Sequence, residues 1–239
     1  MNKIFLFLAL FIAISNSFSQ KKDKKLQKEI ETLIQGFKGE IGVYVKNLEN
    51  NKVVSINADS VFPTASMVKV PILVGIMQKI ENGELQYHQK LQYKDSLLYA
   101  GEDILGSFKH NEFIELSKVI MLMLTTSDNT ASLWLQSTAG GGSRINEIMD
   151  SLSFSQTKVN SRTKGRETAR NAYGWGQTTP FEMATLFEKI AAKKVINEKA
   201  SEKMLRLLGR NYWDEEGIAP IPSDVFIAFK NGAVNDSRS

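Results

Sequence analysis

Residues 63–80 read PTASMVKVPILVGIMQKI. The Pro-Thr pair that opens this run breaks the preceding pattern, and we expect a helix over residues 66–80. Ser66 and Lys69 are three positions apart at its start, so their hydroxyl and amine share one face of the helix. Free N–H groups at a helix start stabilise an oxyanion, and burial lowers the pKa of a lysine so that it can act as a base. The pair is a candidate nucleophile and base, although S-x-x-K alone arises by chance in a lysine-rich chain.

Upstream of this run, the pattern indicates a helix followed by a hairpin. Apolar residues at helical spacing predict an amphipathic helix over 26–37, which Gly39 ends. Apolar residues then alternate over 41–45 and 54–56, on either side of the Asn50-Asn51 turn. This alternation predicts a β-hairpin with one buried face.

Downstream, the chain is mostly helical. The stretch 113–124 is apolar nearly all round and predicts a fully buried helix, and further helices are expected over 131–137, 145–152 and 204–208. Thr179-Pro180-Phe181-Glu182 is a capping box with proline at the first helical position, and it starts another helix. A strand is expected over 225–229. This order predicts an α+β fold in which both chain ends form an antiparallel sheet and a mostly helical subdomain is inserted between them.

Composition excludes several classes of protein. The 239 residues, 42% hydrophobic and 23% charged, suffice for one large domain or two small ones and do not suit disorder or a coiled coil. Most of the net charge of +4 comes from the run Lys21–Lys25, which we expect to be a solvated tether, and the rest of the chain is close to neutral. A nucleic-acid binder would carry a basic face throughout, so we expect no nucleic-acid partner. With two histidines, no cysteine and no G-x-S-x-G elbow, a Ser-His-Asp triad, a zinc site and thiol chemistry are all disfavoured. The base of an enzyme would therefore be a lysine or a carboxylate.

Residues 1–19 predict a signal peptide. A positive start precedes an apolar run over 4–14 that is too short to span a bilayer, and Ser17 and Ser19 suit a cleavage site. The alternative is a buried N-terminal helix. Because no later run is long enough for a membrane span and no cysteine is present, we expect a soluble domain over 20–239, exported to a compartment such as a periplasm.

Two further polar triplets are candidates for chemistry. Ser127-Asp128-Asn129 interrupts a strongly apolar helical stretch, and burying such residues without purpose would be costly. The alternative is a surface loop between two helices. Lys230-Asn231-Gly232 follows the expected last strand, and its glycine permits close approach of the backbone to a ligand. Each triplet is weak evidence alone.

Together and in this order, the three motifs resemble the S-x-x-K, S-D-N and K-T-G set of class A β-lactamases and penicillin-binding proteins. The flanks Pro63-Thr64-Ala65, Thr130-Ala131 and Thr178-Thr179-Pro180 are also similar to this family, and the resemblance covers roughly residues 26–239.

The resemblance implies a role for each motif residue. Ser66 would attack the lactam carbonyl, Lys69 would take its proton directly or through water, and Ser127 would relay a proton to the lactam nitrogen. Lys230 would attract the substrate carboxylate and help to hold Ser127. The oxyanion hole would be the backbone N–H groups of Ser66 and Ala233.

Substrate binding and the release of the acyl group depend on less certain matches. Asn129 would bind the amide side chain of the substrate, and Asn231 and Gly232 would line the site, although Asn231 stands where the family has threonine or serine. Glu167 and Asn171 have the spacing of the glutamate and asparagine that hold the hydrolytic water in class A enzymes. Their loop is shorter than usual and lacks the arginine and aspartate that normally pin it, so the alternative is that Glu167 is a solvent-facing charge.

The expected function is that of a serine hydrolase that opens the β-lactam ring through an acyl-serine intermediate, with no metal or organic cofactor. The alternatives are a penicillin-binding D-alanyl peptidase acting on cell-wall peptides and a β-lactam-binding sensor without turnover. We expect a monomer. The chain ends nine residues after Lys230, where the family has further strands and a terminal helix, so we expect the domain to be incomplete at its C-terminus.

Overall fold

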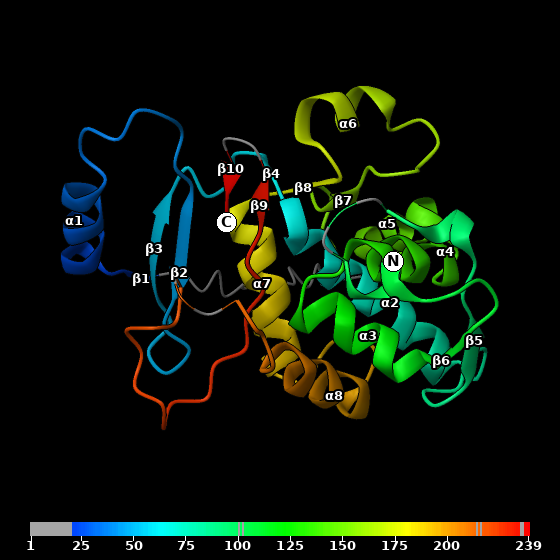
Figure 1. Ribbon diagram of the computed structural model, residues 1–239. Helices are drawn as coiled ribbons and strands as arrows, with labels where there is room; N and C mark the ends of the chain where they lie inside the picture. The colour runs from blue at the N-terminus through cyan, green and yellow to red at the C-terminus, as the bar shows by residue number, and fades with distance from the viewer. Residues whose placement is uncertain (1–20, 100, 102, 214, 216, 235–236) are drawn as a thin grey trace, which may run out of the picture.

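A computed structural model describes residues 21–99, 101, 103–213, 215, 217–234 and 237–239. The expected signal peptide over 1–19 lies outside the described residues. Figure 1 shows a small sheet and one helix on one side of the molecule and a group of packed helices on the other. Helix α7 (Pro180–Ala191) and the last strands lie between these two parts (Figure 1).

The start of the described chain forms a three-stranded sheet. β2 (Val43–Lys46) and β3 (Lys52–Ile56) pair antiparallel with Val45 opposite Val54, which confirms the predicted hairpin. β1 (Lys21–Lys22) runs parallel to β3, and α1 (Lys24–Leu33) follows it. The lysine run predicted as a tether is thus exposed but ordered. α1 ends at Leu33 rather than at residue 37, and none of its residues is buried.

The hydrophobic core surrounds α2 (Lys69–Glu81), which follows a 3₁₀ turn, η1 (Ala65–Val68). The helix predicted over 66–80 is therefore confirmed except for its first turn. Every residue from Lys69 to Met77 is buried, because α2 packs mainly against α4 (Asn129–Thr138), α5 (Gly141–Ser151) and α8 (Glu198–Leu208). A helix that is apolar all round is buried in this way.

The helix predicted over 113–124 begins later than expected. Residues Phe113–Glu115 form β6, which pairs with β5 (Lys90–Gln92), and only Leu116–Thr125 form α3. The prediction of a fully buried helix was also wrong, since Lys118 and Met121 are exposed. An apolar run alone does not separate strand from helix, and here the pairing with β5 decides.

The helix start predicted before α7 is confirmed, but only half of the capping box forms. The side chain of Thr179 accepts a hydrogen bond from the Glu182 N–H at 3.1 Å, and Pro180 occupies the first turn. The Glu182 carboxylate accepts instead from the backbone N–H groups of Gln156 and Thr157. The ring of Phe181 in α7 meets Tyr44 of β2 edge-on at 5.2 Å, which ties the sheet to the helices. Helix α8 ends at Leu208, as the helix predicted over 204–208 does, but it begins earlier, at Glu198. A second three-stranded sheet, in the order β4-β8-β7, consists of β4 (Phe62–Pro63), β8 (Gly176–Thr178) and β7 (Lys158–Val159).

The strand predicted over 225–229 was wrong. These residues join no strand ladder in the described chain, and the Phe229 N–H donates instead to the carbonyl of Leu208 at the end of α8. β9 (Ala233–Val234) follows and pairs antiparallel with β10 (Ser237–Arg238). Alternating apolar residues form a strand only where a neighbouring strand supplies the hydrogen bonds. The α+β class is confirmed, while the sheet is divided into small sheets of two and three strands.

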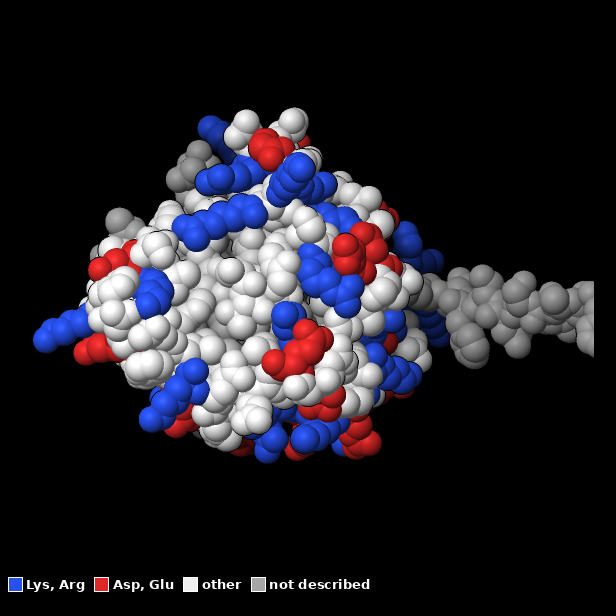
Figure 2. All heavy atoms as spheres, turned by 90° about the vertical axis from the view of Figure 1, so that its right-hand side faces the viewer, with Lys and Arg blue, Asp and Glu red and all other residues white. Residues whose placement is uncertain are grey.

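The surface of the helical part carries charges of both signs. Figure 2 shows acidic and basic side chains around an uncharged central area, with basic ones along the upper edge, the level at which α6 (Glu167–Tyr173) projects in Figure 1. Among the helices of the described ranges, none is long and apolar enough to cross a membrane.

Candidate active site

Ser66 lies in the 3₁₀ turn that precedes α2, directly after a strained residue. Ala65 has a φ of +43°, a left-handed conformation that is unfavourable for a residue with a Cβ atom. A Cβ atom on Gly232 would lie 2.5 Å from the carbonyl oxygen of Thr64 and 3.0 Å from the Ser66 nitrogen. Only glycine therefore fits at position 232, and it brings the start of β9 beside the Ser66 N–H.

Lys69 is the first residue of α2 and has no exposed surface. Its Nζ lies 3.0 Å from Ser66 Oγ, 2.9 Å from Ser127 Oγ and 2.9 Å from Asn129 Oδ1, and it also donates to the Ser127 carbonyl. Burial, with the positive charge of Lys230 as a smaller cause, lowers the pKa of Lys69 to about 7. A substantial fraction of the amine is thus neutral near pH 7, with a lone pair to accept the Ser66 proton.

Ser127 and Asp128 lie in the short connection between α3 and α4, and Asn129 is the first residue of α4. Ser127 has a φ of +61°, a second strained residue beside Lys69. Asp128 caps α4, since its Oδ1 accepts a hydrogen bond from the Ala131 N–H at 2.7 Å. Its Oδ2 accepts another from the Leu105 N–H, outside this helix, at 2.9 Å. Desolvation raises the pKa of Asp128. The triplet is thus buried or half-buried against Lys69, not a loop free in solvent.

The third triplet reaches the same place from the end of the chain. Lys230 is 5% exposed, and burial lowers its pKa to about 8. Its Nζ donates to the carbonyl and to Oδ1 of Asn231 at 3.0 and 3.2 Å. The triplet and the following Ala233, together with Ser66 and Ser127, line one cavity of about 940 Å³.

The structure does not bring Glu167 and Asn171 into this cluster. Both lie in α6, which stands away from the other helices in Figure 1, and both are exposed. The Glu167 carboxylate accepts from the Gly165 N–H at 3.1 Å, and neither residue lines the cavity of Ser66. Arg166, which the sequence analysis overlooked, anchors this segment: its guanidinium donates to Asn160 Oδ1 at 2.9 Å and to Gln177 Oε1 at 2.6 Å.

Two other residues near the site were also missed. Asp103, before the 3₁₀ turn η3 (Ile104–Ser107), accepts hydrogen bonds from the backbone N–H and the hydroxyl of Thr130 at 2.7 and 3.0 Å. Trp213, which follows the end of α8 along the chain, lines the cavity of Ser66. No motif marks either residue, because their positions depend on packing between distant segments.

The arrangement suits acyl transfer to a serine. A hydroxyl lies within hydrogen-bond distance of an amine whose pKa is near 7, and a second hydroxyl and a cation stand beside them. Across the described residues, no group of three or more His, Cys, Asp or Glu side chains is placed to hold a metal ion.

Comparison with known proteins gives consistent matches. Residues 25–239 match the sequence model of the Beta-lactamase enzyme family. Beta-lactamase VEB-1 of Pseudomonas aeruginosa is 21% identical over 230 residues, or 94% of this chain and 76% of that protein. The imipenem-hydrolyzing beta-lactamase of Enterobacter cloacae is 26% identical over 230 residues, or 95% of this chain and 78% of that protein. A mutant of PBP-A, solved as its acyl-enzyme complex with penicillin G, has a TM-score of 0.80 and 25% identity, and the match covers 90% of this chain and 79% of PBP-A.

Proposed function

The chain belongs to the Beta-lactamase enzyme family, and on that premise we propose that it is a class A-like serine β-lactamase that opens the ring of penicillin- and cephalosporin-type antibiotics. The observation that carries the proposal is the position of Lys69 Nζ, within 3.0 Å of the hydroxyls of both Ser66 and Ser127. One amine can then serve the nucleophile and the group that protonates the leaving nitrogen.

In the proposed acylation, Ser66 Oγ attacks the lactam carbonyl while the neutral amine of Lys69 takes the hydroxyl proton. The N–H groups of Ser66 and Ala233 stabilise the resulting oxyanion, and the close approach of Gly232 to Ser66 supports this pairing. The C–N bond then breaks, and Ser127 delivers its proton to the nitrogen, recovering one from Lys69. The ring is open and the substrate is held as an ester of Ser66.

The substrate is held by groups on either side of the nucleophile. The positive charge of Lys230 attracts the ring carboxylate, and the Asn231 amide supplies a donor where relatives have a hydroxyl. Asn129 binds the amide side chain of the antibiotic. No cofactor takes part in these steps.

Hydrolysis of the ester requires a base for water, and we propose Glu167, with Asn171 holding the water. The two residues are four positions apart in α6. Glu167 is exposed and does not line the cavity of Ser66, so this role requires the carboxylate to reach that cavity during deacylation.

The proposal is tested by mass spectrometry of the protein mixed with benzylpenicillin. A lactamase releases penicilloic acid and shows a transient adduct that maps to Ser66. Ser66→Ala should abolish both while leaving the fold intact, because only a hydroxyl is lost. Labelling that survives in this variant and maps to another serine would overturn the assignment.

A penicillin-binding protein that deacylates slowly is the second candidate. Two observations favour it: Glu167 does not line the cavity, and PBP-A has a similar fold. In the experiment above, this candidate predicts a persistent adduct and almost no free product.

The proposal also covers the export of the protein and its oligomeric state. We propose that residues 1–19 are a signal peptide, that the domain over 20–239 acts in the periplasm, and that it acts as a monomer. A fusion of residues 1–25 to a reporter that is active only after export tests the first two points, and sedimentation of the mature domain tests the third.

A further inference from the structure

Large hydrophobic side chains line part of the cavity beside Ser66, together with the charged residues Glu215, Lys230 and Arg238. We call these hydrophobic side chains the apolar wall; they are Trp213, Ile218, Ile221, Ile227 and Phe229. Of these, Trp213 is 50% exposed and Ile221 is 38% exposed. Apolar area left open in a cleft gains free energy when a ligand covers it.

Trp213 is held in place by the same turn that carries Ser127. Its indole Nε1 donates to the Thr126 carbonyl at 3.0 Å, and the preceding Tyr212 N–H donates to the Thr125 carbonyl at 2.9 Å. The Trp213 N–H donates to Asn211 Oδ1 at 3.0 Å. The ring is thus a preorganised surface with a set position relative to Ser127, and not a side chain free to turn into solvent.

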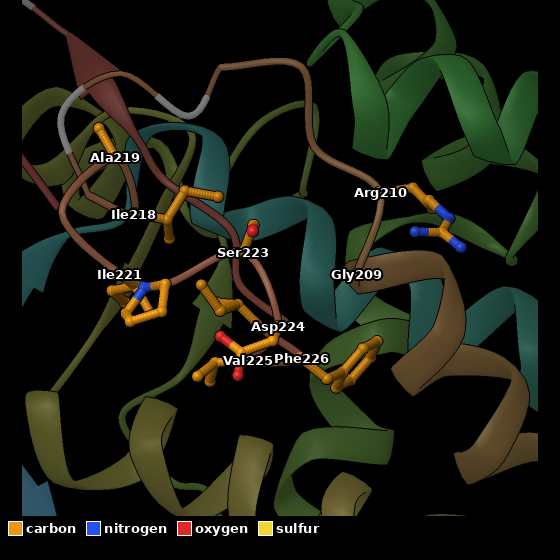
Figure 3. A pocket seen from close by; sticks show the side chains of 11 residues that line it. Gly209, Arg210, Ile218, Ala219, Ile221, Ser223, Asp224, Val225 and Phe226 are labelled. Carbon is orange, nitrogen blue, oxygen red and sulfur yellow. The ribbon is translucent and has the colours of Figure 1, made fainter.

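The rest of the wall belongs to the segment over 217–229. Ile218, Ile221 and Ile227 line both the cavity of Ser66 and a second cavity of about 520 Å³, so the two cavities adjoin. Figure 3 shows Ile218, Ile221 and Asp224 gathered around the second cavity, with Arg210 set apart from them at the end of α8. Three side chains of the apolar wall therefore border open space in both cavities.

We infer that this wall is a subsite for a large apolar or aromatic substituent carried next to the substrate carboxylate, with Trp213 as its specificity-determining residue. The inference rests on the proposed function. If Lys230 holds the carboxylate at C4 of a cephalosporin, the substituent at the adjacent C3 must lie on the same side of the cleft, where the wall stands. The substrate class is therefore cephalosporins with a bulky, flat group at C3.

Two cephalosporins make a matched pair for the test. Nitrocefin and cephalothin share the thienylacetamido group at C7 and differ at C3, where nitrocefin has a dinitrostyryl group and cephalothin a small acetoxymethyl group. Trp213→Ala should lower kcat/KM for nitrocefin about tenfold, the size of a good aromatic contact, and for cephalothin less than twofold. Trp213→Phe should restore most of the loss.

Phe113→Ala is the control, since Phe113 in β6 is 62% exposed and does not line the cavity; it should leave the ratio of the two rates unchanged. Equal losses for both substrates in Trp213→Ala, or an equal change of the ratio in the Phe113 and Trp213 variants, would overturn the subsite. Calorimetry in the Ser66→Ala background separates the two proposals. Weaker nitrocefin binding on adding Trp213→Ala supports the subsite even if the wild type fails to hydrolyse penicillin, whereas unchanged binding rejects it even if hydrolysis is fast.

Discussion

A lysine with no exposed surface is unusual, because burial penalises its charged form. Lys69 remains buried because four oxygen atoms from Ser66, Ser127 and Asn129 surround its Nζ. Ala65 and Ser127, which lie close to Lys69, have strained backbone conformations that cost stability. Such strain is typical of functional sites.

The first prediction at the residue scale concerns pH. If Lys69 is the base, it must be neutral to accept the Ser66 proton, so acylation should rise as pH passes about 7. If Lys230 attracts the substrate carboxylate, it must be protonated to do so, and acylation should fall as pH passes about 8. Stopped-flow acylation by nitrocefin should therefore be fastest between these values. Lys69→Arg should lose most acylation, because a guanidinium keeps its proton, whereas Lys230→Arg should move the alkaline limb upward. A rate that stays level across this range would exclude Lys69 as the base.

The second residue-scale prediction concerns deacylation. Glu167→Gln should acylate at the wild-type rate but release product about 10²- to 10⁴-fold more slowly, the usual worth of a general base. The control is Glu147→Gln, an exposed carboxylate on α5 that pairs with Arg144. Burst kinetics separate the two steps. If wild type and Glu167→Gln release product equally fast, Glu167 is only a surface charge.

At the scale of elements, hydrogen bonds to two carboxylates, those of Asp103 and Asp128, connect the start of α4 to the segment around η3. We call this pair of contacts the lock. Asp128 of the α4 cap holds the Leu105 N–H in η3, while Asp103 of that segment holds the N–H and hydroxyl of Thr130 in α4. The Thr130 hydroxyl in turn accepts from the Tyr99 N–H at 3.0 Å. Because Ser127 and Asn129 lie at this junction, the lock fixes their distance to Lys69.

Asp103→Ala should therefore impair acylation without unfolding the protein. We expect a loss of about tenfold in the acylation rate and faster proteolysis within 95–105, since two hydrogen bonds to a charged acceptor disappear. Asp95→Ala in the same segment is the control, because the Asp95 side chain is 68% exposed and its partner is His110. Equal effects of the two variants would assign Asp103 a merely local role.

At the scale of the whole molecule, stability is concentrated in α2 and its neighbours, while α1 contributes little. Leu73 in α2 has no exposed surface, whereas Leu33 at the end of α1 is 83% exposed. Leu73→Ala should lower the free energy of unfolding by about 2–5 kcal/mol, and Leu33→Ala should change it by less than about 0.5 kcal/mol. Urea denaturation measures both. Similar losses in the two variants would contradict this prediction, because Leu33 would then contribute to the free energy of unfolding despite its exposure.

Local patterns in the sequence were sufficient to predict several elements and the family. The alternation around Asn50-Asn51 predicted the hairpin, the capping box predicted the start of α7, and the three motifs in order predicted the family. These signals are strong because the hydrogen bonds or contacts that they describe lie within a few residues of one another.

Features that depend on residues far apart in the chain became visible only in the folded structure. Residues 225–229 alternate like a strand but find no ladder in the described chain, while Phe113–Glu115 became a strand because β5 pairs with it. Lys69 and Ser127 are 58 residues apart, and their contact, like the burial that lowers the pKa of Lys69, arises only when α2 packs against α4. Pairing, burial and desolvation are properties of the neighbours that folding supplies, so no local pattern records them.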